Sequence, residues 1–256
     1  MLIKLVSYNV NGLRSALSKG LMDWIDNFQP DIICLQEIKA TKDQIDSSLL
    51  SNRGYHHYWF PAEKKGYSGV ALFSKIKPSN VVYGMNNPLY DFEGRLIRSD
   101  FEDVTHLAVY FPSGTSGEMR QKFKMKFLED FSDYIDELLK VRPNLIISGD
   151  LNIAHKEVDI NFPEKHHNMS GFLPEERAWV DKFLAKGFVD TFRIFNQSAE
   201  QYSWWTYRAQ ARLRNIGWRI DYNLVSQTMV SRIHSANIHP DILHSDHCPV
   251  SIDFDL

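Results

Sequence analysis

The sequence predicts an α+β protein in which two β-sheets pack face to face and helices cover their outer faces, a four-layer α/β-β/α sandwich. Short apolar runs recur from one end of the chain to the other, but only three helical patterns lie between them. Strict alternation of strands and helices is absent, which argues against a doubly wound parallel sheet. No linker rich in Pro, Gly or Ser interrupts the chain, so we expect residues 1–256 to form a single domain.

The expected strands are runs rich in Val, Ile, Leu and aromatic residues that end at Gly, Pro or Asn. They cover residues 3–10, 31–36, 55–60, 69–74, 105–111, 144–148, 220–226 and 249–254. The expected helices have apolar residues at helical spacing and cover residues 20–28, residues 118–140 and a segment that begins at Pro174. The aromatic residues of these helices predict core packing rather than ligand contacts.

Composition narrows the class of protein. With 29 basic and 32 acidic residues the formal net charge is −3, which excludes binding of nucleic acid by bulk charge alone. No run of about 18 apolar residues is present, so we expect no membrane span, and the first residues form a strand rather than a signal peptide. Cys34 and Cys248 stand far apart in apolar runs, as buried reduced thiols do. We therefore expect a cytoplasmic protein.

Polar residues stand at the ends of several apolar runs, where a rigid scaffold presents reactive groups. They are Asn9, Asn11, Glu37, Asp150, Asn152, Asp246 and His247, and Asp221 lies inside an apolar run. Each alone carries little information, because an Asp after a strand is usually a turn or capping residue and a lone His is usually structural. Together they supply oxygen ligands, a histidine beside an aspartate, and no thiol. This mixture suits Mg²⁺ or Mn²⁺ and fits zinc poorly.

Hydrolysis of a phosphodiester requires groups of this kind. The phosphate charge must be neutralised, a water must lose a proton, and the leaving oxygen must be stabilised. A metal, positioned amides and a histidine held by an aspartate meet these needs. The residues alone therefore predict a metal-dependent phosphoesterase.

Four short motifs, in this order along the chain, resemble the endonuclease/exonuclease/phosphatase superfamily. They are residues 8–12 (YNVNG), 35–39 (LQEIK), 149–152 (GDLN) and 245–249 (SDHCP). Two longer stretches, 170–177 (SGFLPEER) and 205–222 (from WTY to GWRIDY), resemble the exonuclease III class of abasic-site DNA endonucleases. Lipid and inositol phosphatases share the short motifs, so the longer stretches carry the DNA interpretation. The resemblance runs from Leu2 to about Phe254 and implies a DNase I-like fold with two mixed sheets.

The resemblance also implies a role for each candidate residue. Glu37 matches the main metal ligand, and Asn9, Asn11 and Asp246 match residues around the metal. Asp150 matches the aspartate that positions or activates the attacking water, and Asn152 and Tyr110 match groups that face the phosphate. His247 matches a histidine that contacts the phosphate, as general base or as electrostatic stabiliser, and Asp221 matches the carboxylate that orients it.

Residues 201–220 suit a nucleic-acid contact surface. They hold Arg208, Arg212, Arg214 and Arg219, three of the six tryptophans and no acid. Guanidinium groups bind phosphates and indole rings stack on sugars or bases, although core tryptophans and a solvated arginine loop would give the same pattern. By resemblance, Trp204, Trp218 and Ile220 line a pocket for an extruded sugar without a base, and Arg208 lies near the strand gap or the opposite strand.

The chain departs from the family pattern at two positions. Ser113 stands where members often carry Asn or Gln, and Met169 stands where many carry Asn. Asn168, one position earlier, is the expected substitute in the DNA pocket. Contacts to the phosphates that flank the lesion depend on these positions, so they bear on substrate preference.

We expect a divalent-metal-dependent DNA repair nuclease that cuts the phosphodiester 5′ to an abasic site. It also has 3′–5′ exonuclease and 3′-end-cleaning activity on duplex DNA in this interpretation. Mg²⁺ is the expected cofactor, with Mn²⁺ as a substitute, and duplex DNA with abasic sites or 3′ ends is the expected partner of a monomer. One alternative is a phosphodiesterase for small phosphoesters or lipid headgroups, which needs no arginine–tryptophan strip. The other is a catalytically silent DNA-binding module, which has no reason to keep the whole set of polar residues.

Overall fold

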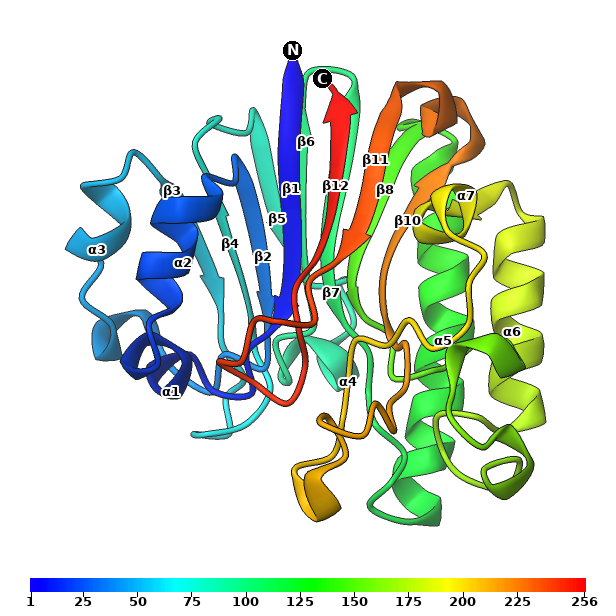
Figure 1. Cartoon of the computed structure of the whole chain (residues 1–256). Coiled ribbons are helices and arrows are strands. Elements are labelled where there is room, and N and C mark those ends of the chain that lie inside the picture. The colour runs from blue at the N-terminus through cyan, green and yellow to red at the C-terminus, as the bar shows by residue number, and fades with distance from the viewer.

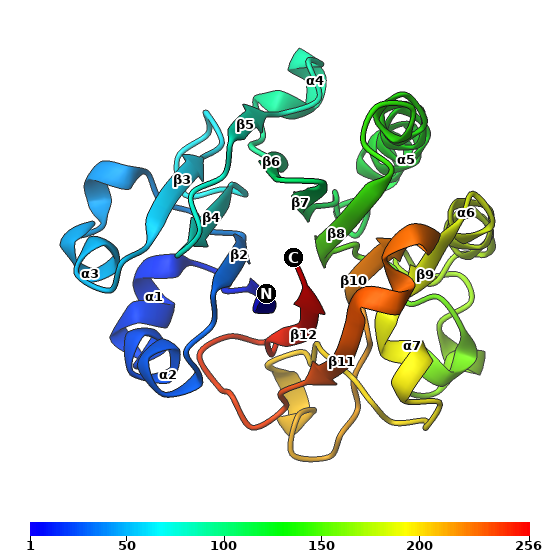
Figure 2. The ribbon, with the colours of Figure 1, turned by 90° about the horizontal axis from the view of Figure 1, so that it is seen from above.

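The computed structural model describes residues 1–256 and contains two six-stranded sheets that face each other, with helices outside both (Figures 1 and 2). The first sheet has the order β11-β12-β1-β2-β4-β3 and the second the order β5-β6-β7-β8-β10-β9. Each contains one parallel pair, β1 with β2 and β7 with β8, among antiparallel pairs. The predicted sandwich of mixed sheets is confirmed.

The strands are β1 (Leu2–Asn9), β2 (Ile32–Gln36), β3 (His56–Phe60), β4 (Val70–Ser74), β5 (Asn80–Tyr83), β6 (Leu96–Phe101), β7 (Val104–Tyr110), β8 (Asn144–Asp150), β9 (Phe188–Asp190), β10 (Asp221–Ser226), β11 (Ile233–Ile238) and β12 (Val250–Asp255). The α-helices are α1 (Leu13–Ser18), α2 (Leu21–Phe28), α3 (Ser48–Ser51), α4 (Pro88–Asp91), α5 (Glu118–Leu139), α6 (Pro174–Ala185) and α7 (Thr191–Phe195). Short 3₁₀ turns are η1 (Lys42–Gln44), η2 (Glu157–Asp159), η3 (Pro163–Lys165), η4 (Arg208–Gln210) and η5 (Gln227–Arg232). No helix is both long enough and apolar enough to cross a bilayer.

Three clusters of buried side chains hold the four layers together. Alternation along β1 sends Ile3 and Leu5 toward the other sheet, and sends Val6 and Tyr8 toward the helices α1 and α2. In β8 the same alternation sends Ile146 toward the first sheet, while the residues on either side of it pack under α5 and α6. The apolar residues whose spacing predicted α5 belong to this cluster between the second sheet and its helices, so the aromatic residues among them are core residues, as expected.

All eight predicted strands are present, whereas β5, β6, β9 and β11 were not predicted. Their sequences explain why. The edge strands β5 and β11 are partly exposed, and β9 has three residues, which is too short for a pattern. β6 carries Arg98 and Asp100, which pair with each other at 2.8 Å and so make a charged strand acceptable inside the protein. The helices α1, α3, α4 and α7 have four to six residues, too few to show helical periodicity.

His106 of β7 makes the stability of the fold sensitive to acid. Its side chain is 1% exposed, and neither ring nitrogen has a hydrogen-bond partner. Burial lowers the pKa of His106 to about 3. The folded protein keeps this ring neutral, whereas the unfolded chain protonates it below its ordinary pKa of about 6.5. Stability is therefore lost as the pH falls from about 6.5 toward 3.

When the pH is lowered from 7 to 5, the free energy of unfolding of the variant His106→Leu is expected to fall by about 2 kcal/mol less than that of the parent. The reason is that the unfolded variant no longer takes up a proton at position 106. Urea unfolding at the two pH values measures the difference. His56→Leu, at an exposed histidine, is the matched control and should behave as the parent does. An equal loss in His106→Leu and the parent would show that another group causes the acid sensitivity.

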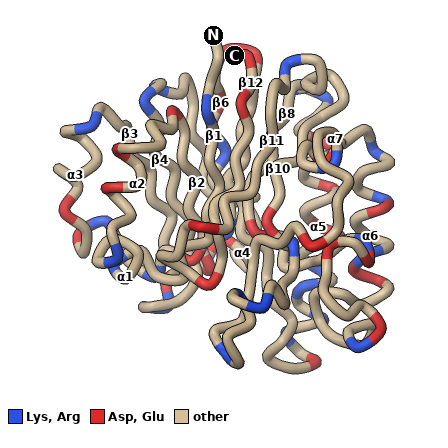
Figure 3. The backbone as a smooth tube through the Cα atoms, in the orientation of Figure 1, with Lys and Arg blue, Asp and Glu red and all other residues tan.

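The chain ends lie together at one end of the sandwich, and the longer loops gather at the opposite end (Figure 1). β1, β2, β7 and β8 all run toward that loop end, so their last residues meet there. Basic and acidic positions are intermingled over the fold, and neither half of the molecule carries one sign alone (Figure 3). Any contact with a polyanion must therefore depend on local groups.

Candidate active site

The gap between the two sheets ends in polar side chains at the loop end. Tyr110, Asp150 and Asp221 are direct cross-strand neighbours on β7, β8 and β10. Their side chains lie on the face of the second sheet that points toward the first sheet. On the same face of β8, four residues before Asp150, Ile146 is part of the apolar core between the sheets. Asn9 of β1 reaches across from the other sheet and donates from Nδ2 to Asp150 Oδ2 at 2.9 Å. The alternation that builds the core thus also places these four residues together.

Glu37 follows β2 and joins this group. Its Oε1 accepts a hydrogen bond from the same Asn9 amide at 3.0 Å, and its Oε2 lies 2.8 Å from Lys39 Nζ. Lys39 Nζ also donates to Asn11 Oδ1. Asn11, Glu37, Lys39 and Asn152 all have positive φ values between 45° and 54°. Such backbone is disfavoured outside glycine and collects at functional sites, and it aims these side chains at one point.

His247 precedes β12 and is 4% exposed. Its Nδ1 lies 2.9 Å from Asp221 Oδ2, which also accepts a hydrogen bond from Ser203 Oγ at 2.6 Å. Its Nε2 lies 3.9 Å from Asp150 Oδ2. The imidazole is therefore held between two carboxylates, with Nε2 directed at the end of the inter-sheet gap.

The charges of the group depend on one another. Burial would lower the pKa of His247, but Asp221, Asp150 and Asp246 outweigh it and raise the value to about 10. Burial and the nearby Asp221 raise the pKa of Asp150 to about 7, against the opposing effect of His247. Burial raises the pKa of Glu37, but the ion pair with Lys39 more than offsets it, so the net shift is downward. The surrounding carboxylates thus favour the protonated form of His247, the ion pair with Lys39 favours the ionised form of Glu37, and burial favours the protonated form of Asp150.

The donor set fits a hard divalent cation. Ligand atoms of Glu37, Asp150 and His247 all lie within 4.8 Å of one another. The carboxylate oxygens of Glu37 and Asp150 are the type of donor that Mg²⁺ prefers. The Lys39 ammonium touches Glu37 and Asn11, so positive charge is already favoured at this point. Asn9 uses its oxygen to accept from the Asn11 main-chain N–H, so its amide orients the two carboxylates and leaves ligation to them.

An apolar half adjoins the polar half within one cavity of about 240 Å³. Trp204, Trp218, Ile220 and Met169 line it, and the indoles of Trp204 and Trp218 meet edge to face at 5.9 Å. Gly171 closes one wall with φ +98°, and a Cβ there would lie 2.7 Å from the Trp218 ring. The polar half of the same cavity is lined by Glu37, Tyr110, Asp150, Asn152, Asp246 and His247.

Asp246 connects the two halves. Its Oδ1 accepts from Asn11 Nδ2 at 2.9 Å, and its Oδ2 accepts from Trp204 Nε1 at 3.1 Å. One side chain thus joins the neighbourhood of Glu37 to the indole wall. The structure places Trp204, Trp218 and Ile220 beside the acidic residues in this cavity, as the sequence predicts. Asn168 and Arg208 lie outside its lining and are exposed.

The idea of a four-arginine contact strip is wrong for two of its members. Arg219 is 1% exposed and pairs with Asp159 and Asp190 at 2.8 and 2.7 Å. Arg212 donates to four main-chain oxygens of residues 240–247, two of them in the loop that carries His247. Only Arg208 and Arg214 remain exposed. Composition alone did not show that the other two arginines have structural partners.

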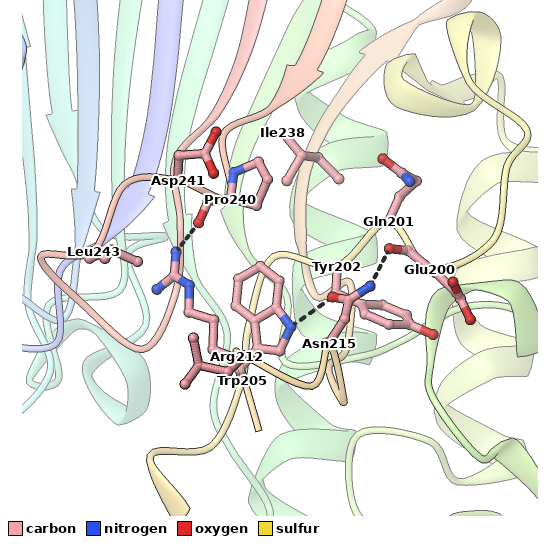
Figure 4. Close-up of a pocket in the computed structure, with 11 residues that line it drawn as sticks. Glu200, Gln201, Tyr202, Trp205, Arg212, Asn215, Ile238, Pro240, Asp241 and Leu243 are labelled. Atoms are coloured by element: carbon pink, nitrogen blue, oxygen red, sulfur yellow. Dashed lines mark hydrogen bonds between the residues drawn. The ribbon is translucent and has the colours of Figure 1, made fainter. Parts of the chain in front are cut away.

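Trp205 faces away from the catalytic cavity, although its neighbour Trp204 faces into it. Figure 4 shows Trp205 and Arg212 in a separate hollow of about 770 Å³, between residues 200–215 and 238–243. The Arg212 guanidinium lies 4.5 Å above the Trp205 ring, and Trp205 Nε1 donates to Asn215 Oδ1 at 3.1 Å. This larger hollow contains none of the acidic cluster, so we assign the chemistry to the smaller cavity.

A second basic region was not foreseen. A hollow of about 560 Å³ is lined by four basic residues, Arg14, Lys39, Lys64 and Lys65, and by two acidic residues, Asp43 and Glu63. Lys39 connects it to the acidic cluster through its ion pair with Glu37. The run Lys64-Lys65 before Gly66 was a signal in the sequence, but it lies far from the motifs along the chain.

Ser113 and Thr115 also line the catalytic cavity, where their hydroxyl oxygens lie 3.0 Å apart.

This fold and this carboxylate–histidine cluster define a phosphoesterase-type site at the end of a two-sheet sandwich. Residues 6–247 match the Endonuclease/Exonuclease/phosphatase family, and the chain belongs to that family. It is 45% identical over 252 residues to an exodeoxyribonuclease of Bacillus subtilis, covering 98% of each chain.

Solved structures agree with the family assignment. A 3′-5′ exonuclease of Neisseria meningitidis superposes with a TM-score of 0.92 and 28% identity, over 99% of this chain and all of that one. An AP endonuclease of Archaeoglobus fulgidus superposes with a TM-score of 0.90 and 29% identity, with the same coverage. The resemblance to the exonuclease III class is therefore confirmed by sequence and by structure.

Proposed function

We propose that this chain is a divalent-metal-dependent DNA repair nuclease that cuts the phosphodiester 5′ to an abasic site and also degrades or cleans 3′ ends of duplex DNA. The observation that carries the proposal is the single cavity in which an acidic, histidine-containing half adjoins a half walled by Trp204, Trp218 and Ile220. A phosphate fits the first half and a sugar without its base fits the second. The exodeoxyribonuclease and AP endonuclease relatives support the same substrate class.

The residues around the phosphate have distinct tasks in this proposal. Glu37 would hold the cation, with Asn11 and Asp246 around it, and the bound cation would supply positive charge next to the phosphate. Mg²⁺ is the ion that this oxygen donor set favours, with Mn²⁺ as a substitute. Tyr110 and Asn152 would hold phosphate oxygens from the β7 and β8 side of the cavity.

Asp150 would take the proton from the attacking water. Its carboxylate is held by Asn9 Nδ2 and by the Asn152 main-chain N–H at 2.7 Å, so one orientation is fixed before substrate binds. His247 lies between Asp221 and Asp150 and would donate its Nε2 proton to the phosphate as negative charge develops there. This geometry favours the electrostatic role for His247 over the general-base role, because both neighbours are acceptors.

The basic hollow lined by Arg14, Lys39, Lys64 and Lys65 gives the DNA backbone a path away from the cavity. Arg208, exposed on η4 outside the cavity lining, would approach the strand gap or the opposite strand. Asn168 is exposed beside Met169 and would serve as a backbone contact at the edge of the pocket. With so few phosphate contacts, affinity should be modest and should fall with salt.

A substrate comparison tests the proposal against its alternatives. Purified chain in Mg²⁺ is given an abasic duplex, an intact duplex, a small phosphodiester and a phosphorylated lipid headgroup. Preferential cutting of the abasic duplex is expected. Hydrolysis of the small esters without DNA cutting would support the phosphoesterase alternative instead, and DNA binding without any hydrolysis would support the silent module.

Trp218→Ala is expected to weaken discrimination for the abasic duplex about tenfold while it changes affinity for intact duplex little, because the variant removes one apolar wall of the sugar pocket. Competition binding with abasic and intact duplexes measures the ratio. Trp59→Ala, on β3 far along the chain from the cavity, is the matched tryptophan control. An unchanged ratio in Trp218→Ala would argue against the pocket.

The proposal also includes a single domain, a cytoplasmic setting and a monomeric chain. A single domain over residues 1–256 agrees with cores that are shared between both sheets. Cys34 and Cys248 are both unpaired and buried, which suits a reducing, cytoplasmic setting. All residues named in the mechanism come from one chain, so a monomer would suffice.

A further inference from the structure

A fully buried ion pair lies directly behind the catalytic cavity. Lys124 of α5 and Glu176 of α6 are both 0% exposed, and Lys124 Nζ lies 2.6 Å from Glu176 Oε1. A buried ion pair seldom stabilises a protein more than well-packed apolar residues would. Its contacts with the cavity wall therefore bear on what it does.

Lys124 holds the main chain of Asn152. Its Nζ donates to the Asn152 carbonyl oxygen at 2.8 Å. Asn152 has a φ of 54°, and its side-chain Nδ2 donates to the Phe111 carbonyl at 3.0 Å. A residue in left-handed backbone needs its neighbours to hold it there. The lysine supplies such a contact on the side away from the cavity, so the direction of the Asn152 amide depends on it.

Glu176 holds the opposite wall. Its Oε2 accepts from the main-chain N–H groups of Gly171 at 2.6 Å and Leu173 at 3.1 Å. Gly171 is the residue that packs against the Trp218 ring. Its main-chain oxygen also accepts from the Ala154 N–H at 2.8 Å, just after Asn152. The phosphate side and the apolar side of the cavity thus meet at one buried charge pair.

We propose that Lys124 is a positioning residue for phosphodiester cleavage, which acts with Glu176 to fix the Asn152 amide relative to the Gly171–Trp218 wall. The inference rests on the proposed function, because it assigns Asn152 to the phosphate and Trp218 to the sugar. Lys124 contacts neither the phosphate nor the sugar in this proposal. It fixes the position of the Asn152 amide relative to the Gly171–Trp218 wall, so its loss should affect the reacting geometry more than the affinity for DNA.

The test uses the double variant Lys124→Met/Glu176→Gln in the full chain. The double change removes both charges, avoids an unpaired buried carboxylate, and keeps a side-chain oxygen for the Gly171 and Leu173 N–H groups. Lys124→Met alone is the second variant. Lys126→Met, two positions along α5 and exposed, is the matched control.

For the double variant, kcat on an abasic duplex should fall about 10- to 100-fold with little change in KM, as small displacements of reacting groups do. The Asn152 side-chain amide and the Trp218 indole N–H should shift in ¹H–¹⁵N spectra, and the Trp59 indole should not. Lys126→Met should match the parent in all these readouts. If Lys124→Met alone unfolds at the assay temperature, the double variant decides.

Unmoved Asn152 and Trp218 resonances with a kcat close to the parent value would overturn the proposal. So would a loss of activity that follows the melting temperature and disappears on cooling, because that result indicates stability alone. A parent chain that fails to cut the abasic duplex would contradict the proposed function instead. The two resonances would still report whether the ion pair holds the cavity walls.

Discussion

Replacement of His247 by alanine is expected to lower turnover of an abasic duplex by about 1,000-fold while duplex binding stays close to that of the parent. The His247 ring is buried, held by Asp221 at 2.9 Å, and aimed at the end of the inter-sheet gap, where the phosphate would lie. Charge that develops in the transition state loses its fixed partner in the variant. The ground-state contacts along the DNA backbone lie elsewhere and remain.

Single-turnover cutting and equilibrium binding of the same labelled duplex separate the two effects. His234→Ala, at an exposed histidine on β11, controls for the loss of an imidazole as such. The variant leaves the buried Asp221 carboxylate without its imidazole partner, which costs stability. Far-ultraviolet circular dichroism therefore checks that the variant is folded. Parent-like turnover in His247→Ala would remove His247 from the site.

Glu37→Gln is expected to raise the Mg²⁺ concentration needed for half-maximal cutting by at least about tenfold, and to lower the rate even at saturating Mg²⁺. Glu37 combines a lowered pKa with a place in the only cluster of acidic and histidine side chains spaced to hold an ion. The glutamine keeps the size of the side chain and the acceptor for Asn9, but removes the negative charge that attracts the cation.

A Mg²⁺ titration of activity, together with calorimetric Mg²⁺ binding to the DNA-free protein, measures this effect. Glu137→Gln changes an exposed acid on α5, outside the cavity and the basic hollow, and should leave both curves unchanged. If Glu37→Gln and the parent bind Mg²⁺ alike, the cation is held elsewhere and the metal assignment fails.

Much of the fold could be predicted because its central strands are long and apolar. β1, β2, β7 and β8 are largely buried on both faces, so their sequences are predominantly apolar and are followed or ended by polar residues. The four strands that were missed are short, exposed at an edge, or carry an internal ion pair. Such strands are specified by their neighbours in the sheet, which a single sequence does not display.

Part of the site was predictable from polar residues at the ends of strands or inside apolar runs. Asp150 and Asp221 were found in this way, whereas Tyr110 was assigned only through the family resemblance, and the structure brings the three side by side. Residues that act through tertiary contacts were beyond reach. Lys124 looks like any lysine on a helix, and Arg219 looks like a DNA contact until Asp159 and Asp190 are seen against it. Spacing reveals faces of an element, but it does not reveal partners across the fold.

The most direct test of the central claim is to map cutting of a duplex that carries one central abasic site and a label at each end of the lesion strand. Purified chain should cut the phosphodiester 5′ to the lesion in Mg²⁺, stop in EDTA, and resume when Mg²⁺ is restored. Asp150→Asn, which keeps the shape of the side chain but cannot take the water proton, should show almost no product. Cutting that persists in EDTA, falls 3′ to the lesion, or proceeds equally on an intact duplex would contradict the account.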